Sequence, residues 1–330
     1  MGNHRIQPIR QGRDGGLALV GWLIGINIAI WVITLSMFRT NGTFLGVALL
    51  AYTLGLRHAF DVDHIAAIDN VVRQLVQKGR PTAAVGLFFS LGHSTVVLCL
   101  SLLTAFATQV AVARLPMLKS IGDIVGTTVS ATFLIAIGLT NISILQRLFR
   151  QTGSAKGRQI NNDNGPSRSP FLRLIPKISS AWQLFPIGFL FGLGFDTATE
   201  IGLLSLSAME TARGVPVTAL LLLPILFACG MSILDTADSV MMQRAYGWAN
   251  DNPARTRYYN LTITGLSTVI AIAIGAAELI GLAEHHQDLS AIEKGVVAMQ
   301  TNSSILGVLV VVMFLLLWIG AALATRLRRT

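Results

Sequence analysis

Four short stretches of the sequence combine histidines, carboxylates and small hydroxyl residues within apolar surroundings. The side chains in them that could bind a cation are His58, Asp61, Asp63, His64, His93, Asp196, Glu200, Asp235 and Asp238. Neutral imidazole together with carboxylate suits Ni, Co, Zn, Cu(II) or Fe, whereas Ca and Mg prefer oxygen ligands alone. The four stretches contain no thiol, which argues against Cu(I). These residue types therefore predict a site for a divalent transition metal.

The spacing of these side chains predicts that each stretch presents its polar groups on one helix face. Residues three or four apart are neighbours on a helix surface, and three pairs follow this rule: His58 and Asp61, Asp196 and Glu200, Asp235 and Asp238. Asp63 points away from His58 on an ideal helix. We therefore expect Asp63 either to support a ligand from behind or to mark a local unwinding of the helix.

The other polar residues of these stretches are predicted to support the site. Serine and threonine in membrane helices commonly hydrogen-bond between helices, and this role is assigned to Ser90, Ser94, Thr197, Thr199 and Thr236. Arg57 and Asp69 are expected near the cytoplasmic boundary, as a salt bridge or as groups that reach the interface.

Apolar residues occur in blocks long enough to cross a bilayer. The chain has 330 residues, of which 52% are hydrophobic and only 12% are charged, which excludes an ordinary soluble enzyme. A spanning helix needs about 20 apolar residues. Eight such helices are predicted, at about 17–37, 44–69, 82–107, 120–145, 184–208, 216–242, 259–283 and 304–324. Continuous runs of this length exclude a β-barrel, so the fold class is all-α, with residues 1–330 as one polytopic membrane domain.

The position of the charges within these blocks points to a shared interior site. Seven of the 16 Asp and Glu and three of the six His fall in the four polar stretches, all within predicted spans. A charge at the bilayer centre costs about 3 kcal/mol on insertion scales. Since such a cost needs a compensating partner, we expect the four stretches to meet around one cation.

Lysine and arginine predict the orientation. With a cytoplasmic N-terminus, 20 of the 25 basic residues lie in cytoplasmic segments and 5 in outer loops, as the positive-inside rule requires. Both termini are then cytoplasmic, and the polar segment at about 147–183 is a cytoplasmic linker between helices 1–4 and 5–8. The net charge of +9 is therefore explained by basic residues that flank the membrane spans. The predicted partner is the lipid bilayer, and no nucleic acid is expected.

The sequence lacks the motifs of an ATP-binding protein and of a zinc protease. The chain has no GxxxxGK-type phosphate loop, so it has no ATP site of its own, and it has no HExxH zinc-protease motif. We interpret the tripeptide Gly2-Asn3-His4 as a chance placement of a possible metal-binding sequence. The pair His285 and His286 is interpreted as part of a solvated loop. Glu278 lies inside the seventh predicted span without an obvious partner.

The motifs RHAFDVDHI, FSLGHSTVV, LGFDTATEI and GMSILDTADS resemble the four signatures of the nickel/cobalt transporter family (NiCoT). The resemblance extends over almost the whole chain. It implies a secondary permease for Ni2+ or Co2+ in a bacterial cytoplasmic membrane, with no enzymatic activity and no permanent cofactor.

Carried over by position, the resemblance makes His58, Asp63 and His64 the core metal residues, with Asp61 alongside. The remaining residues of the path would be His93, Asp196, Glu200, Asp235 and Asp238. Val62 departs from the alanine usual in the family, and the bulkier side chain would narrow the site. Phe60 resembles the type of member that also accepts cobalt.

Three other functions stay open on the residues alone. One is a carrier of another divalent ion or a proton-coupled carrier of an organic cation. Another is an accessory or sensor protein that binds metal without moving it. A membrane metalloenzyme is the third, although three histidines in the predicted spans are too few for a desaturase-type di-iron centre.

Overall fold

The computed structural model describes residues 11–106, 109–153, 178–194, 198–250, 253–284 and 302–327. Every regular element in these ranges is a helix. They are α1 (Gln11–Phe38), α2 (Gly42–His58), α3 (Val62–Gln77), α4 (Val85–Phe106), α5 (Gln109–Gly153), η2 (Ala181–Gln183), α6 (Leu184–Phe191), α7 (Ala198–Ala212), α8 (Val217–Leu220), α9 (Leu222–Asn250), α10 (Pro253–Glu284) and α12 (Ser303–Leu327). The chain is therefore an all-helical protein, as predicted.

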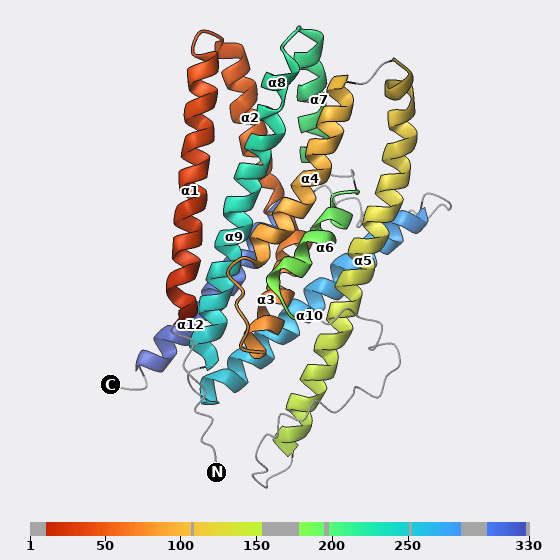
Figure 1. The fold of residues 1–330 in the computed structure, drawn as a ribbon. Helices are drawn as coiled ribbons and strands as arrows, with labels where there is room; N and C mark the ends of the chain where they lie inside the picture. The colour runs from red at the N-terminus through yellow and green to blue at the C-terminus, as the bar shows by residue number, and fades with distance from the viewer. Residues whose placement is uncertain are drawn as a thin grey trace.

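Six of the described helices are long and apolar enough to cross a membrane, or seven if the bent pair α2 and α3 forms one span. Apolar side chains such as Ile28 on α1 and Leu316 on α12 are exposed, as expected of surfaces that face lipid. The α1 and α2 helices stand side by side, α9, α4 and α5 follow across the bundle, and α10 crosses it obliquely (Figure 1).

The second predicted span, at 44–69, is not one continuous helix. It ends at His58 and resumes at Val62, with a bend of 53° between α2 and α3. The amide of Asp61 bonds to the carbonyl of His58 at 2.8 Å, and Asp61 then takes an extended backbone as the residue that precedes α3. The side chain of Asp61 makes no capping hydrogen bond to α3, so its carboxylate is available to other partners. The local unwinding considered for this stretch is therefore present, and the unbroken helix is wrong.

Two further predicted spans are also divided. The stretch 184–208 forms α6 and α7, with residues 195–197 outside the described ranges. The stretch 216–242 is interrupted at Leu221, between α8 and α9. Pro224 lies in the same stretch and has no N–H to offer the carbonyl four residues earlier, so a kink is expected near it. The interruption falls three residues before that proline.

The α3 helix is largely buried in the bundle, although it carries several polar residues. Two of its buried polar residues have partners on other helices. Asp69 accepts hydrogen bonds from Tyr246 at 2.5 Å and Ser267 at 2.6 Å. Asn70 accepts one from Asn141 on α5 at 2.6 Å. Because Asp69 is only 1% exposed and binds the hydroxyls of Tyr246 and Ser267, the expected salt bridge or group that reaches the interface is wrong for it. Arg57 is exposed at the end of α2.

One glycine allows the last helix to reach the break between α2 and α3. A Cβ on Gly307 of α12 would overlap the carbonyl oxygen of Phe60. Only glycine lets the two backbones approach this closely. The contact places the start of α12 directly behind Asp61.

Candidate metal centre

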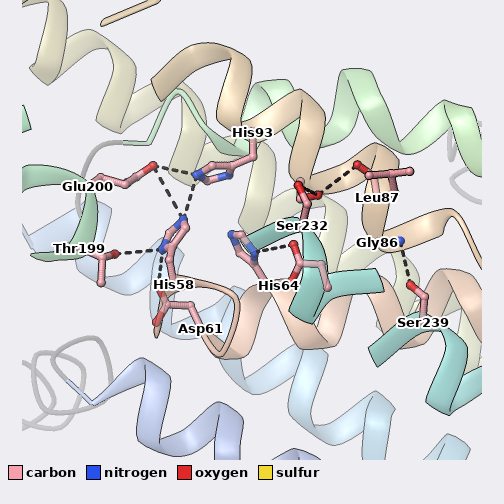
Figure 2. A network of polar contacts seen from close by, with 12 residues as sticks. His58, Asp61, His64, Gly86, Leu87, His93, Thr199, Glu200, Ser232 and Ser239 are labelled. Carbon is pink, nitrogen blue, oxygen red and sulfur yellow. Dashed lines mark hydrogen bonds and ion pairs between the residues drawn. The ribbon is translucent and has the colours of Figure 1, made fainter. Parts of the chain in front are cut away.

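Three histidines from different parts of the sequence meet in the interior. His58 is the last residue of α2, His64 lies in the first turn of α3, and His93 lies in α4. One ring nitrogen of each lies within 4.8 Å of those of the other two. Their exposed fractions are 1%, 0% and 2%. Figure 2 shows the three rings facing one another.

The break between α2 and α3 orients His58. Its Nδ1 atom lies 2.7 Å from Oδ2 of Asp61 and 3.1 Å from the hydroxyl of Thr199. The other carboxylate oxygen of Asp61 accepts hydrogen bonds from Ser303 at 2.8 Å and Ser304 at 2.5 Å, at the start of α12. A neutral imidazole that donates from Nδ1 to a carboxylate keeps its lone pair on Nε2. In His58, Nε2 is the atom that faces the cluster.

Glu200 completes the group from the first turn of α7 and has no exposed surface. Its Oε1 atom lies 2.8 Å from Nε2 of His93 and 3.9 Å from Nε2 of His58. The two histidine Nε2 atoms are 2.9 Å apart. Three donor atoms thus converge within a few ångströms from α2, α4 and α7 (Figure 2).

His64 stands beside this group with both ring nitrogens buried and without a hydrogen bond. Among the described residues, the carboxylate atom paired with it is Oδ2 of Asp235 on α9, 3.7 Å from its Nδ1. That Asp235 oxygen is also buried and makes no hydrogen bond. Leaving buried polar atoms unsatisfied costs about 1–3 kcal/mol each. A cation between Nδ1 of His64 and Oδ2 of Asp235 would satisfy these two atoms.

Some of the remaining predicted residues contact the cluster or join helices, some make no hydrogen bond, and two lie outside the described residues. Thr199 contacts His58 as a supporting residue, and Ser90 donates to Ser232 at 3.0 Å, which ties α4 to α9. Ser94 and Thr236 have buried hydroxyls without a hydrogen bond. Phe60 packs against the core. Asp196 and Thr197 lie outside the described residues.

Asp63 and Asp238 do not join the histidine cluster. Both carboxylate oxygens of Asp238 are buried without a hydrogen bond. Asp63 lines a cavity of about 30 Å³ beside the cluster. His58 and His93 also line this cavity, together with Ser130 and Glu278.

Three contributing residues, Ser130, Ser303 and Ser304, were not singled out from the sequence, and a fourth, Glu278, was noted there without a partner. Ser303 and Ser304 hold Asp61, while Ser130 and Glu278 line the cavity. A serine pair at the start of a predicted span is too common a pattern to identify its partner. Glu278 carried a signal, as an acid within an apolar block, but its neighbours come from a distant helix.

The fold and this cluster together define a helical membrane protein with a buried set of imidazole and carboxylate donors. The family model described as high-affinity nickel-transport protein matches residues 44–324. The chain belongs to this family.

Individual relatives agree with that assignment. The high-affinity nickel transport protein of Cupriavidus necator is 41% identical, over 95% of this chain and 92% of the relative. The high-affinity nickel-transport protein NixA of Helicobacter pylori is 46% identical, over 75% and 78%. The cobalt transport protein NhlF of Rhodococcus rhodochrous is 38% identical, over 87% and 84%. No solved structure matches the chain.

Proposed function

We propose that this protein is a secondary transporter that imports Ni2+, Co2+ or both across a bacterial cytoplasmic membrane. The observation that carries the proposal is the geometry of three donor atoms: Nε2 of His58, Nε2 of His93 and Oε1 of Glu200. The names of the relatives in Cupriavidus, Helicobacter and Rhodococcus support the choice of metals.

The three donor atoms form a nearly right-angled triangle. Its short edges, 2.9 Å and 2.8 Å, meet at His93, and its long edge from His58 to Glu200 is 3.9 Å. An ion at the middle of the long edge would lie about 2 Å from all three atoms, which is a normal metal–ligand distance. Tetrahedral ligands at that distance would stand about 3.3 Å apart. The triangle therefore favours a square or octahedral arrangement, and a square arrangement of N and O ligands is typical of Ni(II) and Cu(II).

His64 and Asp235 would offer the ion its next contacts. Both side chains are buried, and Nδ1 of His64 lies 3.7 Å from Oδ2 of Asp235. In our proposal the carboxylates of Glu200 and Asp235 neutralise the charge of the ion inside the membrane. Because the donors come from α2, α3, α4, α7 and α9, small movements between these helices would exchange ligands and release the ion.

The remaining parts of the proposal concern topology and energy. We propose eight spans, with α2 and α3 as one bent span, α6 and α7 as another, and both termini in the cytoplasm. The distribution of lysine and arginine supports this orientation. A membrane potential would supply about 4.6 kcal/mol per 100 mV for a divalent ion, at about 2.3 per charge.

Uptake of radiolabelled nickel and cobalt by cells that express the chain tests this function. The wild-type protein should accumulate metal above a vector control, and His58→Ala should reduce accumulation to the control level. His285→Ala serves as the matched control, since it removes a histidine that belongs to none of the four motifs, and its uptake should equal that of the wild type. An immunoblot of the membrane fraction checks that all variants are present.

Each rival function predicts another result. Undiminished uptake by His58→Ala would contradict the ligand assignment. Competition by another divalent ion stronger than by nickel or cobalt would show a different cargo. Binding by purified protein without any cellular accumulation would favour the accessory or sensor role.

A further inference from the structure

Glu278 is an acidic residue within a candidate membrane span, and the histidine cluster does not use it. It lies in α10, in the apolar stretch Leu261–Leu282. Ionisable side chains within a span are costly, and they mark ion pathways when they face a cavity. Oε1 of Glu278 accepts a hydrogen bond from Ser130 of α5 at 3.1 Å. The sequence offered no partner for Glu278, and the structure supplies one from a distant helix.

The cavity of about 30 Å³ connects Glu278 with the metal centre. His58 and His93 line the cavity together with Asp63, Ser130 and Glu278. A cavity of at least about 10–15 Å³ can hold a water molecule if polar partners surround it. This cavity therefore has room for a water molecule or a small cation, with imidazoles and carboxylates around it.

Close helix packing bounds the cavity. A Cβ on Gly126 of α5 would overlap the backbone nitrogen of Gly194, and both glycines line the cavity. The α5 helix also packs against α10, which crosses it obliquely (Figure 1). Glu278 therefore lies on a helix that packs against α5, and it lines the cavity.

We propose that Glu278 and Asp63 form a second cation position, adjacent to the histidine cluster and one step along the ion path. This proposal rests on the proposed transport function. Its ligands are carboxylate oxygens completed by water, which bind first-row divalent ions less tightly than a set containing imidazole. A weaker neighbouring position lets an ion leave a tight one, as conduction through several sites requires.

The alternative is that Glu278 only ties α10 to α5 through its hydrogen bond. Two substitutions separate these roles. Glu278→Gln keeps the side-chain volume and an oxygen that accepts from Ser130, but it removes the charge. Ser130→Ala removes the hydrogen bond and keeps the charge.

The first measurement is nickel uptake as a function of concentration for the wild type and both variants. We expect Glu278→Gln to lower the maximal uptake rate by about tenfold or more, the size of a lost charged contact. Ser130→Ala should remain close to the wild type. Normal uptake by Glu278→Gln, or an equal loss in both variants, would overturn the proposal.

The second measurement is equilibrium nickel binding to the purified, full-length protein in detergent. The wild type should bind one Ni2+ tightly and a second weakly, and Glu278→Gln should lose only the weak one. Loss of the tight site, or identical binding by both proteins, would overturn the second position. If wild-type cells take up no nickel, the transport function fails, whereas the binding comparison still decides on Glu278.

Discussion

Nδ1 of His58 lies 2.7 Å from Oδ2 of Asp61, across the break that separates α2 from α3. The contact joins the last residue of one helix to the residue that precedes the next. Since two serines of α12 hold the other oxygen of Asp61, three helices determine the direction in which His58 points. We infer that Asp61 positions a ligand and does not itself bind the ion.

This relationship predicts the behaviour of Asp61 variants. Asp61→Asn should weaken nickel affinity by about 10–100-fold, the usual effect of removing a carboxylate behind a metal-binding histidine. The concentration dependence of uptake measures this change. Ser303→Ala, which removes one of the two hydroxyl donors to Asp61, should produce a smaller shift in the same direction. Wild-type affinity in Asp61→Asn would contradict the positioning role.

Glu200 is expected to contribute charge as well as an oxygen atom. Glu200→Gln retains the side-chain shape but leaves a divalent ion less neutralised in a buried site, so nickel affinity should fall by about 30-fold or more. Equilibrium binding to purified protein measures the effect. Glu210→Gln is the matched control: Glu210 lies on the same helix, is 2% exposed and pairs with Arg213 at 2.6 Å. Equal losses in both variants would show that the effect is not specific to the site.

The contact between α12 and the helix break predicts a difference between two glycines. Gly307→Ala should lower the free energy of unfolding by about 1–3 kcal/mol, because the added methyl group overlaps the Phe60 carbonyl. Gly320 lies on the same helix with nothing within 4 Å of an added Cβ, so Gly320→Ala should leave stability unchanged or raise it. Thermal unfolding in detergent compares them. A similar melting temperature for both variants would contradict the close contact.

Asp69 is predicted to stabilise the bundle without acting on the ion. Tyr246→Phe removes one of its hydrogen bonds and should lower the free energy of unfolding by about 1–3 kcal/mol. Nickel affinity measured at a temperature where the variant is folded should equal that of the wild type. A large loss of affinity at unchanged stability would instead place Asp69 on the ion path.

The sequence alone predicted the all-helical fold, most of the apolar spans and the residues His58, His93 and Glu200, and the physical reason is the bilayer. Charged and imidazole side chains are so unfavourable in hydrocarbon that His58, His93 and Glu200 stand out within the apolar blocks of the chain. The three-residue spacing of His58 and Asp61 correctly predicted their contact. The reason given was wrong, because the contact crosses a helix break and not a regular helical turn.

Only the tertiary structure decided which helices meet. Nothing near Asp61 in the chain indicates that Ser303 and Ser304 will reach it from more than 200 positions away, and Glu278 and Ser130 are separated by 148 positions. Asp69 shows the same limit, since an acid near the end of a predicted span looks interfacial until Tyr246 and Ser267 surround it. The pattern of apolar residues along a helix indicates which of its faces contacts lipid and which faces the protein interior. The packing between helices determines which partner a buried polar group meets. The sequence around that group does not show this packing.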